Sequence, residues 1–212
     1  MSKRIKKTNK IVKIIPNLLI VFSLLLIYLI FAPTLKEETT FQARNIYQKV
    51  IKTVNPEKEQ VWNPIPVNTD FSIVIPKIYA KSAIIANVDA TDSKVFLKQL
   101  KKGVAHAQGT ALPGEGGNIY LFAHSTDAFY NIGFYNAVFY LIGKLNTGDE
   151  IFIYYKGIKY NYLVFDKRVV NANDTKYLGN IGDGETLTLQ TCYPPGTTLK
   201  RLVVLAQQVQ TQ

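Results

Sequence analysis

The chain has 212 residues, with 25 basic against 15 acidic side chains and a formal net charge of +10, a balance often associated with nucleic-acid binding. Six of the basic residues lie within the first 16 positions, where no acidic residue occurs, which leaves 19 basic against 15 acidic side chains in the rest. The excess charge therefore belongs mainly to an N-terminal tail, and a nucleic-acid partner is not expected. The single cysteine, Cys192, excludes an intramolecular disulfide.

An almost uninterrupted apolar segment follows the basic tail. As a helix, residues 14–32 would span the ~30 Å hydrocarbon core of a bilayer, so we expect a basic tail at 1–13 and a transmembrane anchor at 14–32. A cleavable signal peptide is the alternative, but the apolar run exceeds the usual ~7–15 residues and no small-x-small cleavage site follows it. The basic cluster before the segment predicts a single-pass protein of the cell membrane, with a cytoplasmic N-terminus and an extracytoplasmic domain.

Residues 33–69 are expected to form an extracytoplasmic stalk. A short helix is predicted at 41–54, because apolar residues recur there at helical spacing and Pro56 follows. The rest contains three prolines within NPEKEQVWNPIPVNTD and is expected to be extended. A spacer that holds the domain away from the membrane is the favoured interpretation, and a regulatory segment that folds over the active site is the alternative.

A folded domain at 70–212 is predicted to consist mainly of β-strands. A short helix is expected at 92–102, with a cap at Thr91 or Asp92 and an end at Gly103. Residues 134–145 are expected to form a short helix or an irregular turn, and 171–185 a polar loop. About eight strands with one or two short helices predict a β-barrel or closed sheet. The expected strands lie at 71–78, 82–89, before the glycine-rich loop 109–117, and at 118–123, 150–155, 159–170, 186–192 and 199–206.

Three side chains at predicted strand ends are candidates for chemistry. Cys192 ends an alternating strand and precedes a Tyr-Pro-Pro-Gly turn, a position at which a rigid strand aims a side chain and a loop exposes it. His124 closes another apolar strand, and Arg201 lies near the start of the last one. Taken singly, each has a structural alternative: a small buried hydrophobe, a histidine at a sheet edge and a solvated charge. Together they suggest a Cys, a His and an Arg that converge.

Other kinds of site receive little support. His106, His124 and Cys192 match no known metal-ligand spacing, so we predict no metal site, and His106 is interpreted as a structural residue or one at the rim of the site. The glycine-rich loop lacks the Lys-Ser/Thr ending of a phosphate-binding loop. We therefore expect no cofactor.

The motif Thr188-Leu189-Gln190-Thr191-Cys192 resembles the Thr-Leu-x-Thr-Cys signature of sortases, the membrane-anchored cysteine transpeptidases of bacterial cell surfaces. Arg201 follows nine residues later, as the arginine of that family does, and His124 within LFAHS matches its histidine. The segment GVAHAQGTALPGEGGN also resembles the family. The resemblance covers roughly residues 71–209 together with the N-terminal anchor.

This resemblance implies an eight-stranded sortase-type β-barrel and a reaction in two halves. Cys192 would attack the carbonyl between Thr and Gly of a Leu-Pro-x-Thr-Gly-like sorting signal and form a thioacyl intermediate. His124 would protonate the leaving amine and later deprotonate the incoming one, while Arg201 would stabilise the oxyanion or hold the peptide. Thr191 would line the site and contact the substrate.

The resemblance favours certain sortase classes and certain acceptor amines. The Cys-Tyr-Pro-Pro-Gly-Thr turn resembles housekeeping or class D- and E-like sortases more than the iron-acquisition class. The expected acceptor is an amine of a peptidoglycan precursor, and the alternative is a pilin lysine. A non-catalytic surface β-module and an ordinary cysteine peptidase also remain. Some sortases bind calcium before the cysteine strand, where Asp174, Asp183 and Glu185 offer oxygens here, but no fixed spacing supports such a site.

Overall fold

The computed structural model describes residues 2–54, 65–125 and 138–209, and the fold below refers to these residues. Two compact units are present, residues 1–47 and 48–212. The chain begins with α1 (Ser2–Val54), a single helix of 53 residues. It therefore joins the predicted tail, the predicted anchor and the predicted helix at 41–54, which we had expected to be separate. The helix passes through both Pro16 and Pro33, and residues 35–38 (Leu-Lys-Glu-Glu), which link the predicted anchor to the predicted helix, favour helix.

The predicted transmembrane anchor is not confirmed. Among the residues that the structure describes, no helix is both long enough and apolar enough to cross a membrane. The proline-rich part of the predicted stalk, including Trp62, falls largely within 55–64, outside the described residues.

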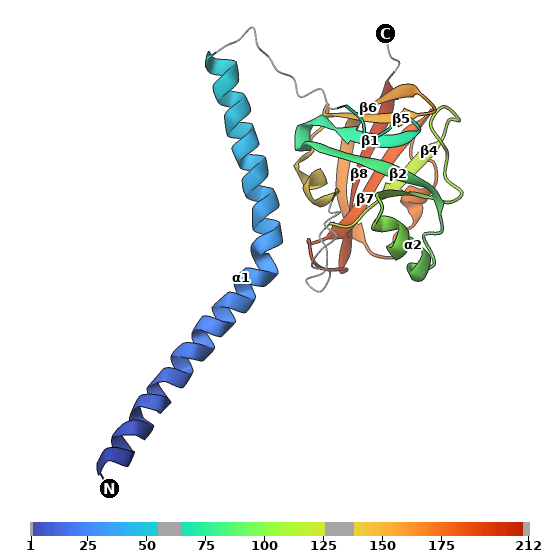
Figure 1. Ribbon diagram of the computed structural model, residues 1–212. Coiled ribbons are helices and arrows are strands. Elements are labelled where there is room, and N and C mark those ends of the chain that lie inside the picture. The colour runs from blue at the N-terminus through green and yellow to red at the C-terminus, as the bar shows by residue number, and fades with distance from the viewer. Residues whose placement is uncertain (1, 55–64, 126–137, 210–212) are drawn as a thin grey trace. The chain divides into compact units, whose positions relative to one another are not determined.

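Eight strands form a closed barrel, as predicted. Around the barrel, neighbouring strands follow the order β1-β2-β3-β4-β7-β8-β6-β5 (Figure 1). The pairs β2–β3 and β4–β7 are parallel, and the other six are antiparallel. The strands are β1 (Phe71–Ile75), β2 (Ala80–Val88), β3 (Val104–Ala107), β4 (Asn118–Phe122), β5 (Glu150–Tyr155), β6 (Ile158–Asn171), β7 (Thr186–Tyr193) and β8 (Lys200–Val209).

The connection between β2 and β3 contains α2 (Ser93–Leu100), as parallel strands require a crossover. The Asp92 carboxylate caps this helix by accepting a hydrogen bond of 2.8 Å from the Lys94 N–H, which confirms one of the two predicted caps. Three short 3₁₀ helices complete the described part: η1 (Pro76–Ile78), η2 (Tyr140–Lys144) and η3 (Lys176–Leu178). Residues 134–137 of the predicted helix or turn at 134–145 lie outside the described residues.

The 3₁₀ helix η3 lies within the segment that the sequence predicted as a polar loop. Its central residue, Tyr177, is only 4% exposed and belongs to an apolar cluster with residues of β3, β4 and β8. This segment therefore packs against the barrel. The sequence did not predict this packing, because Tyr177 is surrounded mostly by polar and glycine residues.

Apolar side chains pack on both sides of the barrel wall, because side chains alternate along each strand. Ile119 and Leu121 of β4 are fully buried and face the interior. Tyr120 and Phe122, between and after them, face outward and join a cluster that includes Leu100 of α2. Successive residues of one strand thus serve opposite sides of the barrel wall. The outer cluster consists of Val88, Leu100, Ala105, Ala107, Tyr120, Phe122, Tyr177, Val203 and Leu205.

Candidate active site

The end of the parallel pair β4–β7 places His124 and Cys192 at the same level. Phe122 is the register partner of Gln190, and the Ala123 N–H donates a hydrogen bond of 3.1 Å to the Gln190 carbonyl. Two residues beyond this pair, β4 has led into His124 and β7 has reached Cys192. Because side chains alternate along a strand, Cys192 shares the outer face of β7 with Gln190, the partner of Phe122, while His124 follows just beyond the last residue of β4.

Arg201 reaches the same face from the other side of β7. It lies directly opposite Cys192 in the antiparallel ladder between β7 and β8. Cβ atoms of directly opposed residues are typically about 4.5–5.5 Å apart and their side chains share one face. Cys192 and Arg201 therefore lie together on adjacent strands, His124 follows the end of the strand on the other side of β7, and each of the three is partly exposed.

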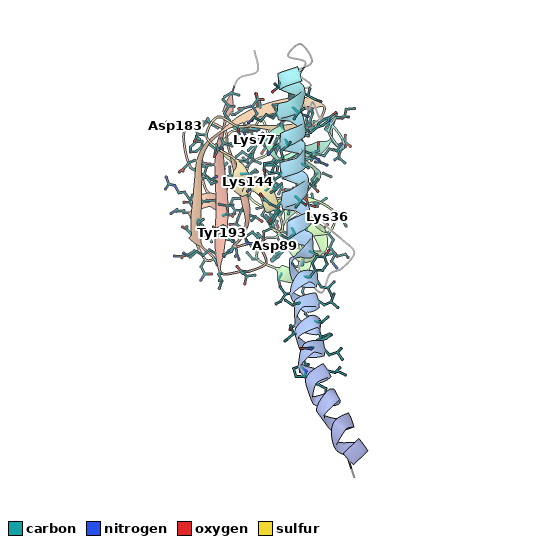
Figure 2. All side chains as sticks on the ribbon, turned by 90° about the vertical axis from the view of Figure 1, so that its left-hand side faces the viewer. Lys36, Lys77, Asp89, Lys144, Asp183 and Tyr193 are labelled. Carbon is teal, nitrogen blue, oxygen red and sulfur yellow. The ribbon has the colours of Figure 1, made fainter. Side chains whose placement is uncertain are left out.

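Figure 2 locates this end of the barrel. Tyr193, which follows Cys192, lies toward the same end of the barrel as Asp89. Asp89 is the first residue of the connection between β2 and α2. Asp183, which precedes β7, lies toward the opposite end. β7 therefore runs the length of the barrel wall and delivers Cys192 where the loops begin, a position suited to meeting a substrate.

The Arg201 guanidinium also organises the loop between β7 and β8. Its Nη1 donates hydrogen bonds to the Thr198 carbonyl at 3.1 Å and to the Lys200 carbonyl at 3.0 Å. Both contacts use a single nitrogen of a group that has five N–H donors in all. The guanidinium can hold the loop and still offer donors to a substrate carbonyl or oxyanion.

Thr191 does not lie on the face that carries Cys192. Its side chain is 3% exposed and faces the interior, and its Oγ1 donates a hydrogen bond of 2.9 Å to the Ala123 carbonyl. The predicted substrate contact through this side chain therefore has no support. The alternation of the strand separates neighbours in the motif, so Thr191 instead ties β7 to the residue before His124.

A polar pair that the sequence did not single out lies beside the three candidates. The Tyr120 hydroxyl donates a hydrogen bond to Gln190 Oε1, and both residues occupy the outer face. Burial raises the pKa of Tyr120, an effect that the positive charge of Arg201 partly opposes, so the hydroxyl remains a donor at neutral pH. Gln190 occupies the variable position of the signature, which is why the motif alone drew no attention to it.

The other histidine, His106, occupies the barrel interior and is fully buried. Its Nδ1 accepts a hydrogen bond of 3.3 Å from the Asn87 N–H, and its Nε2 lies 3.0 Å from the Ala111 carbonyl. Burial lowers the pKa of His106, so the ring is neutral at pH 7. The structural role predicted for His106 agrees with these contacts.

The carboxylates suggested for calcium contact different partners. Glu185 Oε2 accepts hydrogen bonds from the N–H groups of Gly114 at 2.7 Å and Gly116 at 3.2 Å, and Oε1 accepts one from the Tyr162 hydroxyl. Asp174 pairs with Lys176 at 3.2 Å. Within the described ranges no group of three or more His, Cys, Asp or Glu side chains is arranged to hold a metal. Glu185 instead fastens the glycine-rich loop to the start of β7.

Comparisons with known proteins identify the family of this chain. The family model for the sortase domain matches residues 73–209. The chain is 30% identical over 138 residues to sortase D of Bacillus subtilis (strain 168), a match that covers 64% of this chain and 61% of the relative.

Two solved structures share the fold. A sortase D5 transpeptidase of Clostridium perfringens is 27% identical with a TM-score of 0.54, over 73% of this chain and 88% of that one. Sortase C1 of GBS pilus island 1 is 26% identical with a TM-score of 0.55, over 67% of this chain and 64% of that one. The chain belongs to the sortase family, whose members are cysteine transpeptidases.

Proposed function

We propose that this chain is a transpeptidase that cleaves a Leu-Pro-x-Thr-Gly-like sorting signal between Thr and Gly, with Cys192 as the nucleophile. One observation supports the proposal: Cys192 lies directly opposite Arg201, and His124 follows the end of the strand that pairs with β7, in a chain of the sortase family. A thiol, an imidazole and a guanidinium are the groups that acyl transfer through a thioester needs.

The first half-reaction forms the intermediate. The Cys192 sulfur attacks the Thr carbonyl carbon as a thiolate, after its proton has passed to His124, and the resulting oxyanion is stabilised by the fixed positive charge of Arg201. The C–N bond then breaks, His124 transfers a proton to the departing amine, and the acyl group remains on sulfur as a thioester.

The second half-reaction transfers the acyl group. An acceptor amine attacks the thioester carbon, His124 takes the proton from the attacking nitrogen, and the C–S bond breaks to release the Cys192 thiolate, which restores the thiolate and the protonated His124 with which the first half-reaction began. The proposed acceptor is an amine of a cell-wall precursor, so the substrates are surface proteins that carry the signal. A pilin lysine is the second candidate, favoured by the similarity to the sortase of a pilus island.

We also propose that residues 1–32 attach the domain to the cell membrane, with the catalytic domain outside. The support is the sequence order of a basic cluster followed by an apolar run. Fractionation of cells that express the full chain tests this; recovery of the protein in the soluble fraction without detergent would contradict it.

The test of the reaction uses the full chain with fluorogenic Leu-Pro-x-Thr-Gly peptides, with and without amines, and mass spectrometry of Cys192. We expect an acyl adduct that amines resolve faster than water does, and no adduct for Cys192→Ala, whose fold is checked by circular dichroism. Equal resolution by water would indicate a peptidase. A folded protein with a free thiol and no adduct on any peptide would indicate a non-catalytic β-module. Competition between a cross-bridge peptide and a pilin lysine peptide identifies the acceptor.

A further inference from the structure

The outer face beside Cys192 contains Gln190, a partly exposed polar side chain that the mechanism above does not use. Gln190 lies two residues before Cys192 on β7 and points to the same side. Two residues along a strand correspond to a rise of roughly 6.5–7 Å. The Gln190 carboxamide is therefore close enough to contact a peptide held at Cys192.

Burial along β7 shows where this face opens. Thr186 and Thr188 are almost fully buried, and both hydroxyls donate hydrogen bonds to Asn118 Oδ1, at 3.1 and 3.0 Å. Asn118 Nδ2 in turn donates to the Tyr177 carbonyl of η3 at 2.6 Å. Gln190 and Cys192 are partly exposed. The outer face of β7 is therefore buried up to Thr188 and becomes accessible at Gln190. A peptide that extends from Cys192 toward η3 has to pass over Gln190.

The Gln190 carboxamide is held in one orientation. Its Oε1 accepts the hydrogen bond from the Tyr120 hydroxyl, so Oε1 is directed at β4 and Nε2 is the other end of the group. Nε2 has two N–H donors, and among the described residues it has no acceptor. A fixed donor with spare capacity on a partly exposed face suits a ligand carbonyl.

The surroundings indicate which half of the peptide lies there. Partly buried apolar side chains border the outer cluster on this side of the barrel: Ile85, Phe96, Val170, Leu178 and Ile181. The acyl half of the proposed signal begins with Leu-Pro, which is apolar, whereas the acceptor is a polar amine. Burial of apolar surface therefore favours the acyl half on this part of the face.

We propose that Gln190 is a substrate-binding residue that donates a hydrogen bond from Nε2 to a backbone carbonyl in the acyl half of the sorting peptide, about two residues before the scissile bond. Tyr120 is a positioning residue that aims the carboxamide. This inference rests on the proposed function, since it assigns a further contact at the same site.

Two substitutions in the full chain separate the donor from its orientation. Gln190→Glu keeps an oxygen for the Tyr120 hydroxyl but removes the N–H donors, whereas Gln190→Met removes both. In single-turnover experiments we expect both variants to acylate Cys192 about 3- to 10-fold more slowly, the effect of losing one hydrogen bond. Resolution of the preformed adduct by an amine should stay unchanged.

The orientation is tested separately. Tyr120→Phe should slow acylation by a smaller factor in the wild-type background and have no further effect in Gln190→Met. Gln108→Met, at an exposed position after β3, makes the same chemical change away from the site and should alter neither half-reaction.

Several results would overturn the inference. Wild-type acylation by Gln190→Glu would show that only the contact with Tyr120 matters. An equal loss in both half-reactions together with a lower Tm would show a purely structural role. If wild-type protein forms no adduct with any peptide, the proposed function fails and this inference fails with it. If wild type forms the adduct and both variants match it, only the role of Gln190 is lost.

Discussion

The two sides of the barrel wall at β3, β4 and β7 use polar side chains for different purposes. His106 of β3 and Thr191 of β7 face the barrel interior, where each is buried and bonded to backbone groups. Cys192 lies on the outer face of β7, His124 follows the end of β4, and both are partly exposed. Thr191 and Cys192 are adjacent in sequence, so a single step along a strand separates a structural hydroxyl from a candidate nucleophile.

The structural polar groups of this barrel use their hydrogen-bonding capacity within the fold, whereas those near Cys192 keep part of it available. The interior groups just named have their hydrogen bonds satisfied, as a low-dielectric core requires. Arg201 and Gln190 on the outer face keep donors beyond those used within the described structure. The same rigid wall thus supplies stability on one side and spare donors on the other.

The largest expected effect belongs to the outer face. Arg201→Gln should slow acylation about 10²- to 10³-fold, because one donor to a developing oxyanion contributes ~2.7–4 kcal/mol of transition-state stabilisation. Arg201→Lys should recover part of the rate, since it keeps the charge but loses the planar fork. Stopped-flow acylation measures both.

The matched control is Arg168→Gln. Arg168 is exposed, pairs with Asp166 at 2.6 Å and lies opposite Val203 in the ladder between β6 and β8. This change should leave the acylation rate near that of wild type. A similar loss from Arg168→Gln and Arg201→Gln would mean that general surface charge, rather than the position opposite Cys192, explains the effect.

On the interior face, His106 should affect stability and its pH dependence. The pKa of His106 is lowered from 6.5 by burial, so the folded state binds fewer protons there than the unfolded state. Its contribution is complete above pH 6.5 and is lost as the pH falls from there toward the folded pKa. Wild type should therefore lose stability in urea as the pH is lowered through this range.

The substitution His106→Gln isolates that effect. It should cost about 1–3 kcal/mol at pH 7.5, because buried partners lose their hydrogen bonds, and it should flatten the decline of stability toward acidic pH. Parallel pH profiles for wild type and variant would show that other groups account for the decline.

The smallest expected effect concerns Thr191. Thr191→Val keeps the shape of the side chain but removes the hydrogen bond to the Ala123 carbonyl, so we expect a loss of about 1 kcal/mol in the free energy of unfolding. Acylation should slow only slightly, through looser placement of His124. Thr191→Ser, which keeps the hydroxyl, should retain most of the stability. Loss of substrate affinity without loss of stability would restore the predicted substrate contact.

Much of the barrel could be predicted because its signals are local. Apolar alternation and turn residues marked the strands, and Lys156 and Gly157, both with positive φ, form the predicted turn between β5 and β6. The 3₁₀ helix η3 was not predicted, because its packing against the barrel depends on one aromatic residue, Tyr177, in a polar segment. The continuous α1 was not predicted because the helix passes through Pro33, a residue that disfavours the interior of a helix, at the boundary between the predicted anchor and the predicted stalk.

The mainly-β barrel, the sortase resemblance and the three candidate residues follow from the sequence, because strand periodicity and a short motif are encoded by neighbours in the chain. Which side chains meet depends on how the strands pair. The pairing of Phe122 with Gln190 brings the end of β4, and His124 after it, beside the end of β7, and it brings Gln190 within hydrogen-bonding distance of Tyr120. It also brings the inward-facing Thr191 hydroxyl to the Ala123 carbonyl. Strand pairing joins residues that are distant in sequence, and a shift of one residue would reverse every side chain.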